Sequence, residues 1–565
     1  MKKLVFAVLA IGLGQSIATA DEASEAASEA NAEILGRESQ LLEQQQEALE
    51  REERPSGLDV RELLNPETDL PPATADCIEL DRVRIEGASL LDEWELEVFE
   101  APFIGECITP ELATSVLAKA TNFYISRGFI TSRAYLPNQD LSDGVLTMMI
   151  SEGVVEEIVA ESEAEDFAVG PTLMAEPGDI VNIRDLEQAV DQLNKVPGND
   201  VTMRVEPGER EDSSRVIFEN AGKPGVAGRV SLDNSGSEGT GELVAGLSLR
   251  AGDLLDLSEV WSLSLRDALE SEDRTSSSGS ASVAFPIGYY TLRAGRSYSE
   301  YKTVLSLTTA EVSSEGNTDS LFLGLDRVLF RNQNSKHTVS AELKRDATES
   351  FIADTKIDVQ SRSLNSLSFS SQSAIGFGSN VLILTPEIAL GLSEVDNLPD
   401  GSNTPVENPQ AEYTRFRMTM DWIQSIKLGD VAFNWSSRLR GQYSDDPLYS
   451  SQQLIVGGAG SVRGFDELSI IGDRGYFWQN SLNYRHNIMY GPYPGALDFM
   501  VGYDMGYVQS VRPDAFDGSM TGATAGVTLT VDPVSVGVTV GWPLSVDGGL
   551  DKGPSHAVTT LGINF

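Results

Sequence analysis

The chain has 565 residues, too many for one hydrophobic core, so we expect two or more domains. It carries 86 Asp and Glu residues against 41 Lys and Arg, a formal net charge of −45. This balance argues against a nucleic-acid partner, because phosphate binding requires a basic surface. The simplest interpretation of the acidity is a well-solvated surface.

Residues 1–20 have the pattern of a secretory signal peptide. Two lysines precede an apolar run, and the sequence Ala-Thr-Ala at 18–20 follows as a small-x-small cleavage site. The mature chain is therefore expected to begin near Asp21, beyond the inner membrane. No later stretch has the roughly 18 uncharged apolar residues of a membrane-spanning helix. A place in a membrane would therefore require a closed β-barrel.

The segment 21–53 is rich in Ala, Glu and Gln and is predicted to be a helix. Its large apolar residues recur seven positions apart, which gives a narrow stripe on a polar cylinder. The pattern fits a short coiled coil or a solvated tail as well as a more specific role. Residues 54–76 are rich in proline and are predicted to be a linker.

Two cysteines occur, Cys77 and Cys107, about 30 residues apart. In an exported chain we expect them to form a disulfide, with two buried free thiols as the alternative. The three histidines, His337, His486 and His556, are scattered, and no spacing of metal ligands is present, so no metal site is predicted.

Residues 77–154 are predicted to form a small α+β domain. Thr109 is a suitable N-cap for a helix that ends at Gly128, and strand-like segments lie on either side. Residues 155–222 repeat this order, with a second helix at about 183–193. Two such modules in tandem are typical of binding surfaces, because an exposed sheet edge can take up an extra strand from a client.

From 225 to 565 the pattern changes to short alternating strands. After the turn at Asp532-Pro533, Val534, Val536 and Val538 fall on one face while small and polar residues fall on the other. This alternation predicts lipid-facing hairpins of a transmembrane barrel, with a soluble β-sandwich as the alternative. At about 20 residues per strand and connection, we expect an antiparallel barrel of about 16 strands with a water-filled lumen.

One arginine stands out in the stretch "GGAGSVRGFDELSIIGDRGYFWQN" at 457–480, where Arg463 lies among glycines and small residues. An arginine enclosed by a barrel needs a carboxylate partner. Asp504, between Gly502 and Gly506, is the candidate, because alternation places it on the face opposite to its two neighbours. The glycines around Arg463 lack the third glycine of a dinucleotide loop, so no cofactor is predicted.

The chain resembles the transporter subunit of two-partner (type V) secretion systems, the TpsB proteins of the ShlB/FhaC/HecB haemolysin secretion/activation type. The resemblance covers nearly the whole mature chain. It rests on the order of segments and on four motifs: "SVRGF", "GDRGYFW", "GYDMG" and "FYISRGFITSRAYLPNQDLSDGVLTMMISEG".

The resemblance implies that the two modules are periplasmic POTRA domains, which recognise the N-terminal secretion domain of a large exoprotein, and that the barrel lies in outer-membrane lipid. It implies that helix 21–53 plugs the pore, and that loop 457–475 folds into the lumen with Arg463 paired to Asp504. The loop motif that it assigns consists of Val462, Arg463, Gly464 and Phe465.

Three other functions remain as alternatives: an insertase for other barrel proteins, a passive porin and, least favoured, an enzyme. No catalytic triad or paired-carboxylate cleft can be assigned. The sequence does not identify the exported partner, whether that partner is also activated, or the oligomeric state.

Overall fold

The computed structural model describes most of the chain beyond the N-terminal segments. The described residues are 63–64, 78–162, 169–269, 274–306, 311–357, 360–392, 409–466, 468–512 and 517–565. The predicted signal peptide, the predicted plug helix, the linker except for residues 63–64, and Cys77 lie outside them. No helix among these residues is long and apolar enough to span a membrane.

The first module packs two helices against a three-stranded sheet in the order β1-β3-β2. Strand β3 is parallel to β1 and antiparallel to β2. The alternating burial along β3 places one face on the core and the other toward solvent. The bounds are β1 Arg82–Glu86, α2 Glu93–Glu100, α3 Pro110–Ser126, β2 Arg133–Tyr135 and β3 Val145–Ser151.

The main helix of this module begins and ends where the sequence predicts. The Thr109 side chain accepts a hydrogen bond from the Leu112 backbone N–H, and Gly128 adopts a positive φ of 100° two residues after the helix. Helix α2 was not predicted. It is capped by Asp92, whose side chain accepts from the Glu95 N–H while the Glu95 side chain accepts from the Asp92 N–H.

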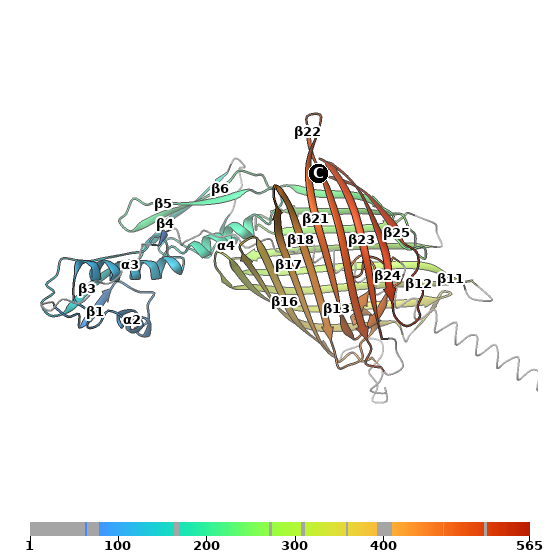
Figure 1. Ribbon diagram of the computed structural model, residues 1–565, viewed down its shortest axis with the longest axis horizontal. Helices are drawn as coiled ribbons and strands as arrows, with labels where there is room; N and C mark the ends of the chain where they lie inside the picture. The colour runs from blue at the N-terminus through green and yellow to red at the C-terminus, as the bar shows by residue number, and fades with distance from the viewer. Residues whose placement is uncertain are drawn as a thin grey trace, which may run out of the picture.

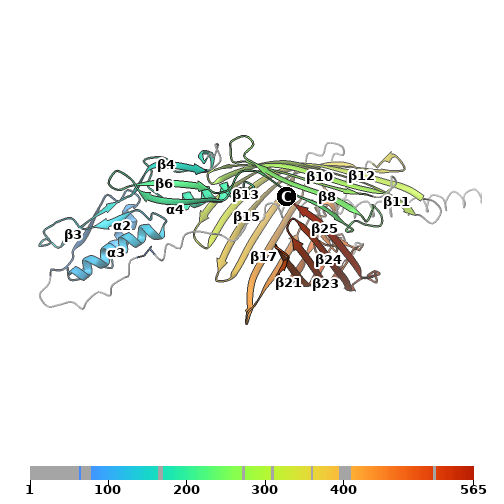
Figure 2. The same cartoon turned by 90° about the horizontal axis from the view of Figure 1, so that it is seen from above.

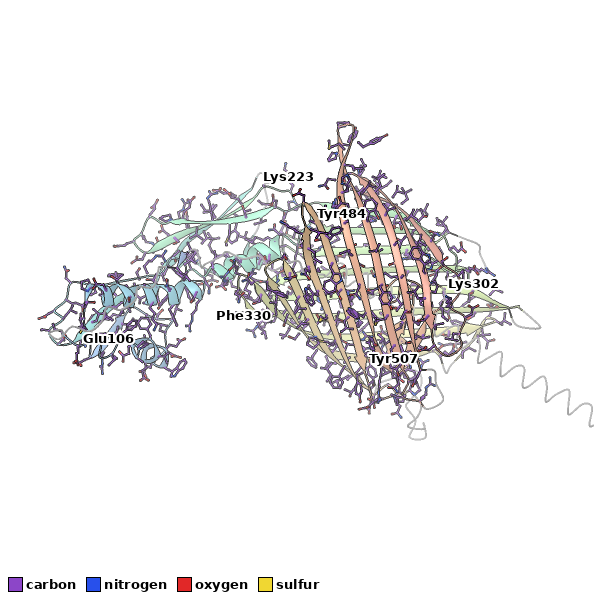
Figure 3. All side chains as sticks on the ribbon, viewed as in Figure 1. Glu106, Lys223, Lys302, Phe330, Tyr484 and Tyr507 are labelled. Atoms are coloured by element: carbon purple, nitrogen blue, oxygen red, sulfur yellow. The ribbon has the colours of Figure 1, made fainter. Side chains whose placement is uncertain are left out.

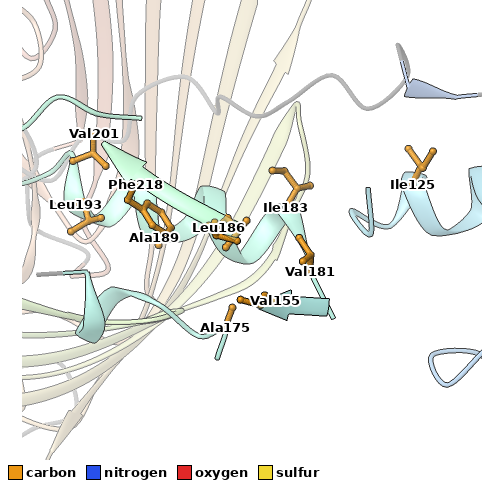
Figure 4. Close-up of a cluster of buried hydrophobic side chains, with 11 residues drawn as sticks. Ile125, Val155, Ala175, Val181, Ile183, Leu186, Ala189, Leu193, Val201 and Phe218 are labelled. Carbon is orange, nitrogen blue, oxygen red and sulfur yellow. The ribbon is translucent and has the colours of Figure 1, made fainter. Parts of the chain in front are cut away.

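The second module repeats the architecture with the sheet order β4-β6-β5. Its helix α4 lays Ile183, Leu186 and Leu193 on the sheet, where Phe218 is fully buried (Figure 4). Ile125 of the first module joins the same apolar cluster, so the two modules share a packed contact. The bounds are β4 Val154–Ser162, η2 Gly170–Thr172, α4 Ile183–Leu193, β5 Val201–Pro207 and β6 Ser213–Asn220.

The remaining strands close into one antiparallel barrel, and β25 pairs with β7 to complete it. Strand β14 contributes two residues beside the end of β13; without it the barrel has 16 strands, as predicted. The bounds are β7 Val226–Asp233, β8 Val244–Gly252, β9 Val260–Ala268, β10 Thr275–Ile287, β11 Tyr290–Ser306, β12 Glu311–Arg331, β13 Ser335–Ile352, β14 Thr355–Lys356, β15 Arg362–Phe377, β16 Asn380–Leu392, β17 Thr414–Leu428, β18 Val431–Tyr443, β21 Arg474–Tyr490, β22 Tyr493–Gln509, β23 Gly518–Val531, β24 Val534–Val546 and β25 His556–Asn564.

The outer face of the barrel is apolar. In the predicted hairpin β23–β24, Val534, Val536 and Val538 are about two-fifths exposed, whereas the intervening Ser535 is buried on the inner side. The predicted alternation of the lipid-facing hairpin is therefore confirmed.

The modules extend in a row from one end of the barrel (Figure 1), and the same arrangement is seen from above (Figure 2). Lys223, in the connection from β6 to β7, lies where the second module meets the barrel (Figure 3). Glu106 of the first module lies farthest from the barrel among the labelled residues (Figure 3).

Candidate functional site

A long connection between β18 and β21, residues 444–473, folds against the inner wall of the barrel; we call it the lumenal loop. Its described residues include the 3-10 turn η3 Ser450–Gln452 and a short hairpin of β19 Leu454–Val456 with β20 Ile470–Gly472. The predicted bounds of 457–475 were wrong at both ends. The loop begins earlier because β18 already ends at Tyr443, and it ends earlier because Arg474 already belongs to β21.

Apolar side chains fasten the loop to the wall. Val462 and Phe465 of the predicted motif are fully buried, and they cluster with Phe477, Val508 and Met520 of β21, β22 and β23. Burying a side chain of this size contributes about 1.5–3 kcal/mol. The loop is thus packed like a small core inside the lumen.

Arg463 makes a bidentate ion pair with Asp504. Its Nε donates to Oδ2 at 2.8 Å and its Nη2 donates to Oδ1 at 2.6 Å. The Arg463 backbone N–H also donates to Oδ2, at 3.0 Å. The Asp504 side chain is fully buried, whereas one fifth of the Arg463 side chain is exposed. Such a buried carboxylate would be strongly destabilised if the arginine were removed.

Two further groups of the barrel wall accept hydrogen bonds from the guanidinium. Arg463 Nη1 donates to Ser481 Oγ at 2.8 Å, and Nη2 donates to the Asn480 carbonyl oxygen at 3.0 Å. The Asn480 N–H in turn donates to Asp504 at 3.2 Å. The planar fork of arginine matches this set of acceptors, which a lysine could not reproduce.

Glycines allow the loop to approach the wall. A Cβ on Gly502 would lie 2.8 Å from Arg463 Nη2, and one on Gly506 would lie 2.4 Å from the Val456 side chain. Gly464 of the motif faces Gly522 of β23, where an added Cβ would lie 2.6 Å from the Gly522 Cα. The structure therefore brings all the predicted residues of the loop motif and of the wall into one site.

Sequence reasoning missed Ser481, Gly522 and Asp473. The fully buried Asp473 carboxylate accepts from Leu448 N–H at 2.8 Å and Gln453 Nε2 at 2.9 Å, both in the loop. It also accepts from the Val511 N–H at 2.8 Å, in the connection between β22 and β23. Asp473 lies within the "GDRGYFW" motif of the family resemblance, so the motif indicates that this segment matters. Nothing in the sequence indicates which groups bind the carboxylate.

The lumen beside residues 451–455 of the lumenal loop is polar and contains both basic and acidic side chains. A cavity of about 160 Å³ is lined by loop residues and by the barrel wall, including Arg415, Arg417, Glu387 and Asp346. Arg415 pairs with Glu387 at 3.3 Å and donates to Gln452 of the loop at 2.7 Å. Such a surface is wettable and offers hydrogen bonds to a polar chain.

A cluster of charges joins the second module to the barrel. Arg331, at the end of β12, donates to Asp191 of α4 at 2.9 Å, and Lys336 of β13 lies 3.8 Å from the same carboxylate. In the β10–β11 turn the Tyr289 hydroxyl donates to Asp185 Oδ1 at 2.6 Å. Burial raises the pKa of the Asp185 carboxyl, although the hydrogen bond from Tyr289 opposes the shift. Helix α4 is thereby fixed to the rim.

Cys107 is disulfide-bonded. Because Cys77 lies outside the described residues, the pairing of these two cysteines stays a prediction.

Comparison with known proteins identifies each part of this architecture. The family model described as "Haemolysin secretion/activation protein ShlB/FhaC/HecB" matches residues 212–529. A ShlB-type POTRA model matches residues 78–153, and a second POTRA model matches residues 154–207.

Individual relatives match over most of their length. The outer membrane transporter CdiB of Escherichia coli O6:K15:H31 (strain 536 / UPEC) is 31% identical over 522 residues, 90% of this chain and 86% of the relative. The hemolysin transporter protein ShlB of Serratia marcescens is 25% identical over 497 residues, 86% of each chain. The solved structure of CdiB from Escherichia coli has a TM-score of 0.83 at 27% identity, and the match covers 95% of this chain and 98% of that one.

These matches place the barrel in the outer membrane and the two modules in the periplasm, so the end of the barrel that carries the modules is the periplasmic end. The chain therefore belongs to the ShlB/FhaC/HecB family and is an outer-membrane transporter of the two-partner secretion type.

Proposed function

We propose that this transporter exports one large exoprotein through its barrel, after recognising the N-terminal secretion domain of that protein in the periplasm. The main support is the lumenal loop, which is held inside a 16-stranded barrel by a buried bidentate ion pair. Relatives named as hemolysin transporters suggest a haemolysin-like or adhesin-like client.

Each module offers sheet edges for recognition. Strand β2 is one of the two edge strands of the first sheet, with β1 at the other edge, and β5 is one of the two edge strands of the second, with β4 at the other edge. An unpaired edge presents backbone N–H and C=O groups to an unfolded chain, and addition of a client strand satisfies both partners. Residue pockets beside each edge would then set specificity.

The lumen supplies the route. The polar lining around Arg415 and Glu387 can exchange hydrogen bonds with an extended chain without binding it tightly. Segment 21–53 would occupy the pore at rest and leave it during transport. Folding of the client outside the cell would supply the driving force.

The test is deletion of the gene followed by mass spectrometry of the culture medium and of the outer membrane. We expect one very large secreted protein to disappear while the outer-membrane barrels stay unchanged. A general fall in outer-membrane barrels would instead indicate the insertase function. Deletion of residues 78–222 should abolish export, whereas a passive porin would keep its role without them.

A further inference from the structure

One periplasmic connection of the barrel differs from its neighbours. Residues 253–259, between β8 and β9, form a seven-residue turn that we call the leucine turn, whereas every other strand connection at this end has two or three residues. Its sequence, "DLLDLSE", contains three leucines. A longer turn with apolar residues is unusual where water is expected, since loops are normally polar.

The leucine turn has a defined backbone. Asp253, Asp256 and Ser258 have φ values of 56°, 57° and 56°, in the left-handed region that residues other than glycine rarely adopt. Such conformations persist only when surrounding contacts impose them. The Asp253 N–H donates to the Glu259 carbonyl oxygen at 2.8 Å, and the Ser258 N–H donates to Asp253 Oδ1 at 2.9 Å.

The Glu259 side chain stabilises the turn from its buried side. The residue is fully buried, and its Oε1 accepts from the backbone N–H groups of Leu254 and Leu255 at 2.8 and 2.9 Å. The same oxygen accepts from the indole N–H of Trp261 at 3.0 Å. With its backbone donors directed inward, the turn presents its leucine side chains outward.

These leucines are exposed at the surface of the protein. The exposed fractions are 63% for Leu254, 54% for Leu255 and 43% for Leu257. They continue the lipid-facing surface of the barrel, because Trp261 and Leu265 lie on the outer face of β9 and are 38% and 45% exposed. Tryptophan is enriched where the hydrocarbon meets the lipid headgroups.

We propose that the leucine turn is an interfacial anchor, in which Leu254, Leu255 and Leu257 insert into the periplasmic leaflet of the outer membrane. The occupant is lipid because the turn extends an outer surface that lipid already covers. The turn carries Asp253, Asp256 and Glu259 and no cation, so it suits a zwitterionic leaflet better than an anionic one.

The anchor would also set the depth of the second module. Gly252 at the end of β8 lies so close to this module that a Cβ would come within 2.7 Å of the Val196 side chain, and Arg250 donates to the Lys195 carbonyl oxygen at 3.3 Å. Leucines held at the headgroup level would therefore hold the module at a fixed height below the membrane. This inference does not depend on which protein is exported.

The test measures the depth of the turn in lipid. Leu255→Cys carries a bimane label in full-length protein reconstituted into phosphatidylcholine vesicles, with or without bromine atoms near the headgroup end of the acyl chains. We expect bromolipid to remove most of the fluorescence and aqueous iodide to remove little. The control is Leu550→Cys, which is 40% exposed beside Asp551 in the connection at the opposite end, and here iodide alone should quench. Equal iodide quenching at both positions would overturn the proposal.

A second experiment separates lipid from protein as the occupant. A photo-crosslinking amino acid at position 255 in cells should give no protein adduct during export. An adduct with the exported protein would overturn the anchor and make the turn a client contact.

The triple variant Leu254→Ser, Leu255→Ser and Leu257→Ser should keep the heat-modifiable gel mobility of a folded barrel, but a label at position 261 should lose its quenching by bromolipid.

Discussion

Asp504 is fully buried in the wall of the barrel and receives three hydrogen bonds from Arg463, which stands 41 positions earlier in the chain. One of these bonds comes from the backbone, so the carboxylate fixes the path of the lumenal loop as well as its charge. The ion pair therefore holds the lumenal loop, which is an irregular segment, against the rigid sheet of the barrel wall.

Replacing Arg463 with alanine should abolish most of the export without unfolding the barrel. The change leaves the Asp504 carboxylate buried and unpaired, which costs about 3–5 kcal/mol, enough to release the loop from the wall. Arg463→Lys should be intermediate, because an ammonium group cannot make the bidentate contact. Secreted client in the medium measures the effect, with heat-modifiable gel mobility as the check on folding.

Arg485→Ala is the matched control for this prediction. Arg485 lies on β21 and faces Asp498 of β22 at 3.8 Å, but the two side chains are 63% and 40% exposed. An exposed pair contributes about 0–1 kcal/mol, so export should stay near normal. Normal export by Arg463→Ala would contradict the role assigned to the buried pair.

Gly464→Ala should displace the loop even though every charge is kept. The added methyl group would lie 2.5 Å from the Trp542 carbonyl oxygen and 2.6 Å from the Gly522 Cα, and both are backbone atoms that cannot move aside cheaply. We expect a fall in export close to that of Arg463→Ala. The control is Gly441→Ala on β18, where the nearest atom would be 3.9 Å away; equal export by the two variants would refute the steric argument.

The fold and half of the site could be predicted because strands have a period of two. That period predicts that Asp504 faces the lumen and that Val534, Val536 and Val538 face outward, and the structure places them so. The length of segment 225–565 also predicted a barrel of about 16 strands, and the capping and apolar patterns predicted the main helix of each module.

The rest depends on contacts between distant segments. Asp473 joins the lumenal loop to the connection after β22, and Gly522 matters only because Gly464 lies on it. No local pattern encodes such contacts. Helix α2 is a different case, because Asp92 and Glu95 have the spacing of a capping box and could have indicated its start.

Asp473→Asn should loosen the base of the lumenal loop while leaving the Arg463 site intact. In either orientation the amide NH₂ group would face donors, and each buried donor left unpaired costs about 1–3 kcal/mol. We expect added protease on intact cells to cleave the variant within residues 444–456 or near 511, and export to fall. Asp551→Asn, on an exposed connection at the same end, should resist the protease as well as the unaltered chain does. Identical cleavage of the two variants would show that the Asp473 contacts do not hold the loop.

The contact between the second module and the barrel should weaken as pH rises through the range in which Asp185 titrates. Burial raises the pKa of this carboxyl, with a further contribution from Asp179, while Tyr289 and Arg331 oppose the shift. A raised pKa in the folded state means that the stabilisation is complete below the ordinary value of about 3.9 and is lost as pH rises through the raised value. Asp185→Asn keeps an acceptor for the Tyr289 hydroxyl and removes the titration.

Thermal unfolding of the helical part of the full-length protein, followed by circular dichroism from about pH 4 to about pH 7, measures this effect. The unaltered chain should lose stability relative to Asp185→Asn as pH rises, because only its carboxylate becomes charged in a poorly solvated contact. Other carboxylates titrate equally in both proteins, so the difference between the two curves isolates Asp185. Parallel curves would show that the charge of Asp185 does not govern the junction, and the asparagine variant would then offer no advantage at neutral pH.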